Sequence, residues 1–341
     1  MQPVISIMIP AKNEEKTIAK CLDSLVASDY PKEKMDIMVV VDGSTDRTIE
    51  IAKRYSPLVR VIEHEPQTCK AAALNKSFHL AEGDVIGIYD SDCIVEPDCI
   101  SHIAKRFEDP KIAGVGGTLA SHNNKSFLTK AMSLETTLIS FVQHLISRSG
   151  RSPMFLGKNM FIRKNILLEA GGLDEFTFSE DTSLSISLWK KGHKIVFEPK
   201  AITRHEEPAN FQSFVKQRKR WTRGLVRVRK KSLKMSELFS NFVLRGSYFY
   251  IAPLGLLLLI LFPIFAVFAS PLFLLPLFAL FLVGLGLVVY ARIYFHESLR
   301  DLLALPMWFF LQNVHLPLLV NAYIEERSGK KMKWYKVERE D

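Results

Sequence analysis

Short apolar runs alternate with stretches of helical periodicity over residues 1–205. The predicted strands are residues 4–9, 36–41, 59–62 and 84–89, and the predicted helices are residues 14–27, 45–55 and 70–81. Alternation in this order predicts a mostly parallel α/β sheet with helices on both faces. Ligands bind beyond the carboxyl ends of the strands in such sheets, and polar clusters follow three of these strands.

The pattern becomes looser in the second half of this region. We predict strands at residues 112–120, 155–162 and 194–197, helices at residues 126–146 and 181–190, and an amphipathic basic helix at residues 211–223. We therefore assign residues 1–235 to one α/β domain that ends in a basic helix next to the membrane.

Two uncharged apolar stretches follow, at residues 247–269 and 271–291. Each is long enough to cross a bilayer of about 30 Å, so they predict a transmembrane hairpin rather than a buried helix of a soluble core. The membrane module as a whole covers residues 236–324.

A third apolar segment, residues 302–323, has two prolines and three polar side chains in or near its middle: Pro306, Gln312, Asn313, His315 and Pro317. Polar groups at mid-bilayer cost several kcal/mol unless they are paired. The tail at residues 325–341 is basic and favours a cytosolic C-terminus, to which two spans already return the chain. A re-entrant or interfacial segment is therefore favoured over a third span.

The formal net charge is +9, and ten basic residues with no acidic residue lie within residues 216–235. The rest of the chain is therefore close to neutral, which argues against a uniformly basic nucleic-acid binder, and no nucleic-acid partner is expected. A basic segment before the first span predicts that the α/β domain is cytosolic, most simply at the plasma membrane. Four cysteines without metal-ligand spacing predict free thiols. The first residues show no signal-peptide pattern.

Acidic motifs follow two of the predicted strands. Asp42 comes before Gly43, so its carboxylate can accept a hydrogen bond from a bound nucleobase while the glycine lets the backbone approach closely. Asp90-Ser91-Asp92 places two carboxylates where they can share a divalent cation beside a diphosphate. A capping turn is the structural alternative for Asp42.

Two further motifs come later in the chain. Ser179-Glu180-Asp181 precedes a helix, where a carboxylate can serve as a general base or as a simple cap. Gln217, Arg220 and Trp221 are spaced to share one helical face, which offers an amide, a guanidinium for phosphate oxygens and an aromatic surface for a sugar.

In this order, the motifs resemble those of family 2 glycosyltransferases with the GT-A fold, and they cover about residues 4–222. The matching segments are residues 9–15, 41–44, 70–75, 90–92, 179–181 and 217–221. In layout the chain resembles the membrane-bound synthases of cellulose, hyaluronan, chitin and poly-N-acetylglucosamine, and the ceramide glucosyltransferases. Its departures are Val41 in place of a first Asp, Ser179 in place of Thr, and no membrane segment before the domain.

The resemblance implies a nucleotide-sugar donor, with UDP favoured, and a divalent cation, Mn²⁺ or Mg²⁺. It implies that the nucleotide-sugar pocket is formed by Pro10, Ala11, Glu14, Asp42, Lys70, Asp90, Ser91, Gln217 and Arg220. Asp90 and Asp92 would hold the metal, Asp181 next to Glu180 would be the catalytic base, and Trp221 would contact the acceptor.

These residues predict inverting transfer to a hydroxyl of a lipid-linked or saccharide acceptor. Asp181 is expected to be ionised at its ordinary pKa of about 4. A polyprenyl- or dolichyl-phosphate sugar synthase is an alternative, although a phosphate acceptor hardly needs a base. A processive polysaccharide synthase is a second alternative, and a non-catalytic membrane scaffold is the alternative from another class.

Overall fold

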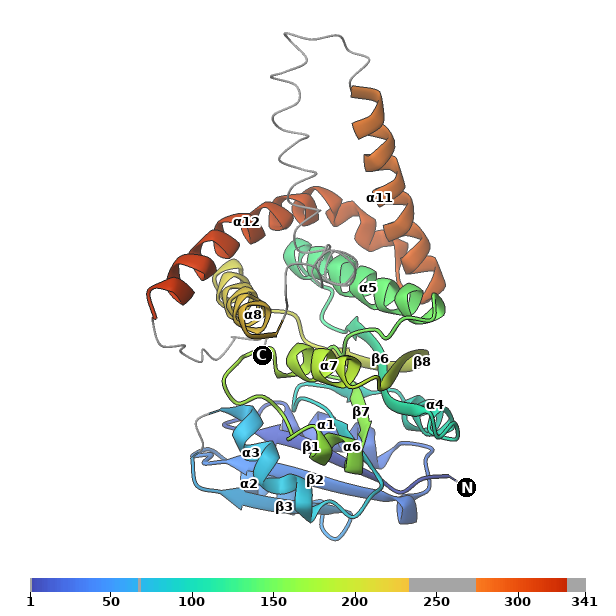
Figure 1. The fold of residues 1–341 in the computed structure, drawn as a ribbon, viewed down its shortest axis with the longest axis vertical. Helices are drawn as coiled ribbons and strands as arrows, with labels where there is room; N and C mark the ends of the chain where they lie inside the picture. Colours follow the sequence, from blue (N-terminus) through green and yellow to red (C-terminus); the bar gives the residue numbers. More distant parts are fainter. Residues whose placement is uncertain (1, 67–68, 233–273, 330–341) are drawn as a thin grey trace. The chain divides into compact units, whose positions relative to one another are not determined.

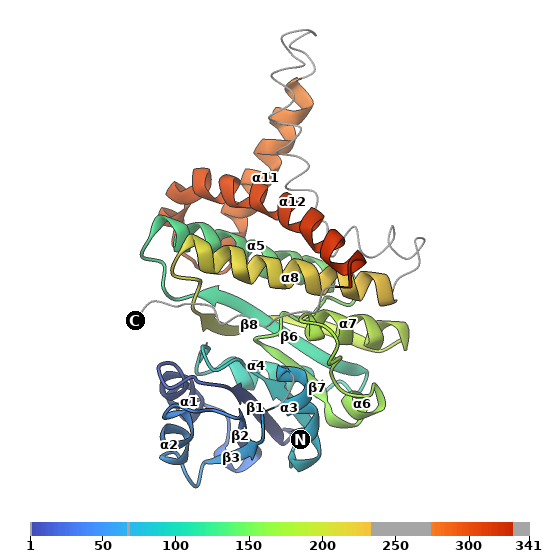
Figure 2. The same cartoon turned by 90° about the vertical axis from the view of Figure 1, so that its left-hand side faces the viewer.

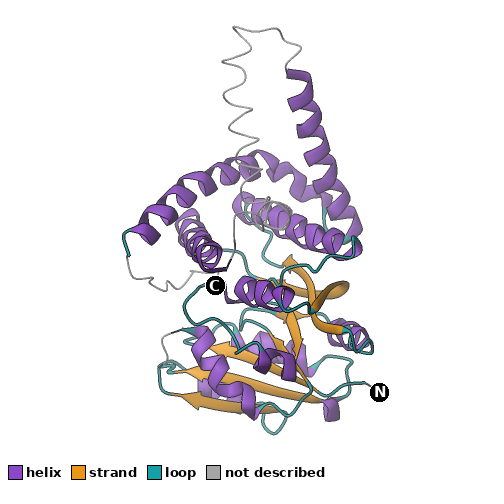
Figure 3. Ribbon diagram, in the orientation of Figure 1, coloured by secondary structure: helices purple, strands orange, loops and turns teal. Residues whose placement is uncertain are grey.

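The computed structural model describes residues 2–66, 69–232 and 274–329, which belong to two compact units. The first unit is Met1–His122 with Gln143–Glu206, and the second is Asn123–Val142 with Glu207–Glu340. Figure 1 gives the labels of the elements, and Figure 3 distinguishes helices from strands. The basic helix predicted at residues 211–223 therefore groups with the apolar C-terminal helices.

The first unit is built on a sheet with the strand order β3-β2-β1-β4-β7-β6-β8-β5. The strands are β1 Ile5–Ala11, β2 Met35–Asp42, β3 Val59–His64, β4 Val85–Ile88, β5 Ile94–Val95, β6 Ile112–Ser121, β7 Met160–Arg163 and β8 Lys194–His205. Strands β3, β2, β1 and β4 are parallel, as are β6 and β8, whereas β7 runs antiparallel to β4 and β6. The predicted mostly parallel α/β sheet is confirmed.

Helices cover both faces of this sheet because side chains alternate along each strand. The first-unit helices are α1 Ile18–Val26, α2 Thr48–Lys53, α3 Lys70–Ser77, α4 Cys99–Arg106, α6 Lys164–Glu169 and α7 Glu180–Lys190. In β1, Ile7 and Ile9 pack with α1 and α4, whereas Met8 packs with α3 and α7. Figure 2 shows α1 and α2 on one side of β1–β3 and α3 on the other.

Several predicted boundaries differ from the structure: the strand predicted at residues 194–197 extends to His205, and the helix predicted at residues 45–55 is α2 Thr48–Lys53. Two further differences have identifiable causes. The helix expected from residue 14 begins at Ile18, because the amides of residues 13–15 donate to side-chain oxygens of Ser44, Thr48 and Asp46. The strand expected at residues 155–162 begins only at Met160. Gly157 has a φ of +68°, which takes the chain out of the extended conformation.

The second unit is helical where the structure describes it. Its elements are the first part of α5 Phe127–Arg148, α8 Phe211–Ser232, α11 Leu274–Tyr294, the short 3₁₀ helix η5 Leu299–Ala304 and α12 Leu305–Arg327. Met132 and Leu134 of α5 pack with Phe214 of α8 and with Trp308 and Leu311 of α12. This apolar cluster joins the basic helix α8 to the C-terminal helices.

The predicted membrane segments are described only in part. Residues 247–269 lie outside the described residues, and residues 271–291 overlap α11. The third segment lies in a continuous helical stretch, Leu299–Arg327, and among the described residues this is the one helix long and apolar enough to cross a membrane. The preference for a re-entrant or interfacial segment over a third span stays a prediction.

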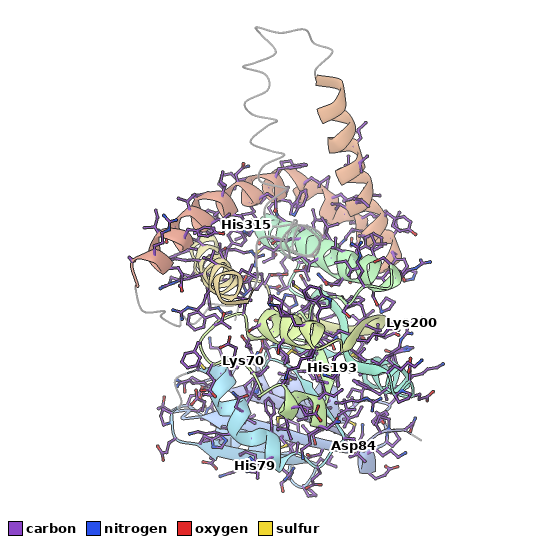
Figure 4. The ribbon with its side chains drawn as sticks, viewed as in Figure 1. Lys70, His79, Asp84, His193, Lys200 and His315 are labelled. Carbon is purple, nitrogen blue, oxygen red and sulfur yellow. The ribbon has the colours of Figure 1, made fainter. Side chains whose placement is uncertain are left out.

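A buried ion pair joins α5 to α8 within the second unit. Arg218 Nη2 donates to Oε2 of Glu135 over 3.0 Å, and the two side chains are 1% and 0% exposed. The Arg218 guanidinium also lies 4.3 Å from the ring centroid of Trp221 and 4.8 Å from that of Phe214. His315 of α12, labelled in Figure 4, lies 3.6 Å from the other oxygen of Glu135.

We predict that Glu135→Ala destabilises the protein by about 3–5 kcal/mol, because it leaves the Arg218 charge buried without its carboxylate. Thermal unfolding of the detergent-solubilised full chain measures this as a fall of several degrees in Tm. The double variant Glu135→Ala/Arg218→Met should recover much of the loss. Arg54→Ala, which breaks an exposed pair with Glu50, is the control and should leave Tm nearly unchanged. A Tm for Glu135→Ala equal to that of the control would contradict the prediction.

Candidate active site

The polar residues predicted at the sheet edge are brought together by strand register. Ala11 pairs with Val41, and Met8 pairs with Ile88, so the chain leaves β1, β2 and β4 at the same edge of the sheet. Asp42 is the last residue of β2, and the loops after β1 and β4 carry Glu14 and the Asp90-Ser91-Asp92 motif. The carboxyl edge of the parallel strands is where such sheets bind ligands.

The loops after β1 and β2 are fastened to each other around Asp42. Asn13 Oδ1 accepts from the amide of Thr45 over 2.7 Å, and the amide of Glu14 donates to Thr48 Oγ1 over 2.8 Å. Asp42 is buried, and Lys12 Nζ lies 3.5 Å from its Oδ2. The two loops therefore form a fixed polar rim at the ends of these strands.

Gly43 is required at its position for two reasons. Its φ is +62°, and a Cβ built on it would come within 2.5 Å of Cγ of Pro66. A side chain at this position would therefore be strained and would clash, so glycine keeps the backbone open next to Asp42. Of the neighbouring predicted nucleotide-pocket residues, Ala11 is buried in β1, whereas Pro10 and Glu14 are half-buried.

Each carboxylate of the Asp90-Ser91-Asp92 motif contacts a lysine ammonium. Lys70 Nζ donates to Asp90 Oδ1 over 2.6 Å, and Lys158 Nζ donates to Asp92 Oδ2 over 2.7 Å. Lys70 is the first residue of α3 (Figure 4). Although burial acts to raise it, the pKa of Asp90 is held below its ordinary value, chiefly by the Lys70 ammonium. Asp90 is therefore ionised at neutral pH.

Asp181 lies in the first turn of α7, and its pKa is shifted in the opposite direction from that of Asp90. Burial and, next, the Glu180 carboxylate raise its pKa to about 7. Its Oδ1 accepts from the amide of Thr182 over 2.7 Å, and Lys70 Nζ lies 3.4 Å from Glu180. The expectation of an ordinary pKa for Asp181 is therefore wrong, because the sequence does not show how little water surrounds this carboxyl.

The residues present fit a divalent cation that arrives with a diphosphate. Within the ranges that the structure describes, no group of three or more His, Cys, Asp or Glu side chains is arranged to hold a metal ion. Asp90 and Asp92 supply two hard oxygen donors. Mg²⁺ commonly binds through one or two carboxylates while substrate phosphates and water complete its shell.

The Gln217-Arg218-Lys219-Arg220-Trp221 motif belongs to α8 in the second unit. Gln217 is buried, and its Oε1 accepts from Arg218 Nη1 over 2.6 Å, while Arg220 and Trp221 are half-buried. Arg218, which links Gln217, Glu135 and Trp221, was not predicted from the sequence as a functional residue. Its distance in the sequence from Glu135 gave no signal for this pairing.

Gly157 and Lys158 are two further site residues that were not predicted from the sequence. A Cβ built on Gly157 would come within 2.9 Å of Oδ2 of Asp181, and the neighbouring Lys158 reaches Asp92. A Gly-Lys pair that interrupts an apolar, strand-like run was the available signal, because neither residue is expected inside a buried strand.

Comparison with known proteins gives several matches. A probable glycosyltransferase of Bacillus subtilis is 33% identical over 235 residues, which are 65% of this chain and 55% of that protein. A β-monoglucosyldiacylglycerol synthase of Nostoc sp. is 31% identical over 231 residues, covering 65% and 49%. A poly-β-1,6-N-acetyl-D-glucosamine synthase of Staphylococcus aureus is 28% identical over 225 residues, covering 64% and 54%. The chain thus spans about half the length of these curated relatives.

A solved structure shares the fold. It is a mannosyltransferase of Pyrobaculum calidifontis in complex with GDP-Man and Mn²⁺, with a TM-score of 0.66 and 20% identity, covering 97% of this chain and 89% of that one. The sequence profile of the family described as glycosyltransferase-like family 2 matches residues 3–224. Because that match covers well over half of the chain, and the fold agrees with it, the chain belongs to the family 2 glycosyltransferases and has the GT-A fold.

Proposed function

We propose that the chain is an inverting membrane glycosyltransferase that moves a sugar from a nucleotide-sugar, with UDP favoured, to a hydroxyl of a lipid-linked or saccharide acceptor. The observation that carries the proposal is the position of the Lys70 ammonium, 2.6 Å from Asp90 and 3.4 Å from Glu180, which brings the Asp90-Ser91-Asp92 motif close to the Glu180-Asp181 pair. There the pKa of Asp181 is raised to about 7. A base is most effective when its pKa lies near the working pH.

In the proposed reaction, the acceptor hydroxyl gives its proton to Asp181 as its oxygen bonds to the anomeric carbon. The bond from that carbon to the diphosphate oxygen breaks at the same time, and the nucleoside diphosphate leaves with the electron pair. When bound, a divalent cation held by Asp90 and Asp92 supplies positive charge to this leaving group. Asp42 accepts a hydrogen bond from the base of the nucleotide.

The acceptor class follows from the base. A hydroxyl must lose a proton during the attack, whereas a lipid phosphate is already anionic, so a carboxyl tuned to about pKa 7 favours the hydroxyl. Two relatives are named as synthases of a glucosyl-diacylglycerol and of a poly-N-acetylglucosamine, which supports a lipid or saccharide acceptor. The polyprenyl- or dolichyl-phosphate acceptor is the second candidate.

The roles of the α8 residues and the orientation in the membrane are proposed from the sequence. Gln217 and Arg220 are proposed to hold the diphosphate, and Trp221 to contact the acceptor. The catalytic domain is proposed to face the cytosol at the plasma membrane, because basic residues precede the apolar segments and follow them.

The direct test is release of nucleoside diphosphate by the purified, detergent-solubilised protein with Mn²⁺ or Mg²⁺. A panel of UDP- and GDP-sugars is used, with and without native lipid extract. Turnover with one donor that the lipid stimulates, and that Asp92→Ala abolishes, supports the proposal. Absence of turnover with every donor, together with no calorimetric binding of UDP or GDP, would favour the non-catalytic scaffold.

We predict that Asp181→Asn lowers kcat by about 10²–10⁴-fold, because the amide cannot accept the proton from the acceptor. Calorimetric affinity for the nucleoside diphosphate should stay within about threefold of the parent. Glu175→Gln, which changes a carboxylate on the loop before α7, is the matched control and should keep kcat. An Asp181→Asn enzyme with full turnover would refute the base assignment.

The raised pKa of Asp181 predicts how activity depends on pH. A carboxyl with a pKa of about 7 is about one-tenth ionised at pH 6 and about nine-tenths ionised at pH 8, so kcat/KM should rise about tenfold across that interval. Donor affinity measured over the same interval should stay flat. A kcat/KM that does not change between pH 6 and 8 would contradict the assignment.

The raised pKa of Asp181 also predicts how the stability of the folded protein depends on pH. Stability should fall with rising pH, whereas activity should increase. The pKa in the folded state lies above that of an unfolded chain, so stability falls as pH rises from about 4 through 7 and Asp181 ionises. Asp181→Asn should therefore unfold at a Tm equal to or above that of the parent at pH 8. A clearly lower Tm there would show that the variant loses activity through misfolding.

A further inference from the structure

The segment of residues 155–158 lies next to both acidic parts of the candidate site in the first unit, Asp181 and Asp92. Gly157 has a positive φ, and a Cβ built on it would come within 2.9 Å of Oδ2 of Asp181, so its backbone lies close to that carboxyl. The next side chain, Lys158, reaches in turn to Asp92, with 2.7 Å between Nζ and Oδ2. Two adjacent residues thus lie beside the proposed base and contact the proposed metal ligand, respectively.

Lys158 is held in place by its neighbours in the chain. Its amide donates to the carbonyl of Leu156 over 2.8 Å, which closes a tight turn. The following residue, Asn159, is fully buried, and its side chain donates to the carbonyl of Ala201 over 3.0 Å. The ammonium of Lys158 therefore starts from a fixed backbone at the beginning of β7.

The pair is buried to a degree that stability alone does not favour. The side chain of Lys158 is 14% exposed and that of Asp92 is 0% exposed. Removing an ammonium and a carboxylate from water costs several kcal/mol each, and their attraction seldom exceeds that cost. Unlike the fully enclosed Arg218–Glu135 pair, this pair keeps its cation partly exposed, so a ligand that carries negative charge can reach the Lys158 ammonium.

The proposed function supplies that ligand. A donor diphosphate brings its negative charges to the Asp90-Ser91-Asp92 motif, and a divalent cation arriving with it takes carboxylate oxygens as ligands. Lysine has a flexible four-carbon stem and commonly binds phosphate oxygens as a point charge. The Lys158 ammonium can therefore leave Asp92 for a diphosphate oxygen without a change in the backbone.

We infer that Lys158 is a donor-binding residue, which neutralises Asp92 in the free enzyme, competes with the divalent cation for that carboxylate, and contacts the diphosphate once the donor is bound. This inference rests on the proposed function. It separates Lys158 from a lysine that serves only as a counter-ion of Asp92, because a counter-ion would not contribute to nucleotide affinity.

The test measures binding to the detergent-solubilised full chain, so that it does not depend on turnover. In Lys158→Met, affinity for Mn²⁺ without nucleotide, followed by electron paramagnetic resonance, should rise about tenfold, because the competing ammonium is gone. Calorimetric affinity for UDP or GDP at saturating Mn²⁺ should fall about ten- to hundredfold, the loss expected for a hydrogen bond between charged groups. Lys105→Met, which changes an exposed lysine of α4, is the matched control.

Each outcome is decisive. Tighter Mn²⁺ binding with unchanged nucleotide affinity would make Lys158 a counter-ion only, and no change in either affinity would also overturn the inference. If Lys158→Met does not fold, Lys158→Arg should keep nucleotide affinity within about threefold and Lys158→Gln should lose it. Equal affinities in those two variants would refute the inference. A parent protein that binds neither UDP nor GDP with metal present would instead refute the proposed function.

Discussion

Carboxylates gather at the carboxyl edge of the sheet and at the start of α7, with side chains that range from 0% exposed for Asp92 to 29% exposed for Asp90. This partial loss of water is the constraint on which the site depends. Like charges in poorly solvated surroundings cannot all ionise at their ordinary pKa, so their pKa values are driven apart. Asp90 keeps its charge because the Lys70 ammonium contacts it directly. Asp181 has Glu180 as its neighbour, and its pKa is raised to about 7. The arrangement of lysines thus decides which carboxyl stays an anion and which can take a proton.

Two glycines allow the backbone to approach these charges. Gly43 and Gly157 both have positive φ, and a Cβ on either would clash, with Pro66 in one case and with the Asp181 carboxyl in the other. Each glycine stands next to a residue of the proposed chemistry, Asp42 or Lys158. At these two positions a side chain would press against the loop beside Asp42 or against the Asp181 carboxyl, which accounts for glycine at each.

The sequence predicted the parts of the fold that depend on local pattern. The apolar, β-branched runs of β1 and β2 and the helical spacing of α1 were assigned correctly, and parallel strand pairing then brought Asp42 and Asp90 to the same edge of the sheet, on either side of β1. The errors arose where distant residues act. The first turn expected before Ile18 is replaced by hydrogen bonds to the loop after β2, and β7 is shortened by the turn at Gly157.

For the candidate site, too, the sequence predicted only the features that depend on local pattern. The motifs gave the identities of Asp42, Asp92 and Asp181, because each stands next to a recognisable strand end or helix start. The contacts of Lys158 and Arg218 depend on residues far away in the sequence, so no local pattern could reveal them. The raised pKa of Asp181 likewise depends on burial by the folded chain, which a motif does not encode.

The Gln217–Trp221 motif shows how one helix can combine support with recognition. Arg218 is enclosed by Phe214 and Trp221 and is neutralised by Glu135, and it also fixes the Oε1 atom of Gln217. Its guanidinium is therefore committed inside the second unit, whereas Arg220 is half-buried and carries the charge proposed for phosphate. Loss of activity on replacing Arg218 would then follow from displacement of Gln217 and Trp221. Two arginines two residues apart in one motif thus have different surroundings: Arg218 holds side chains of the second unit, and Arg220 is the one proposed to hold the donor.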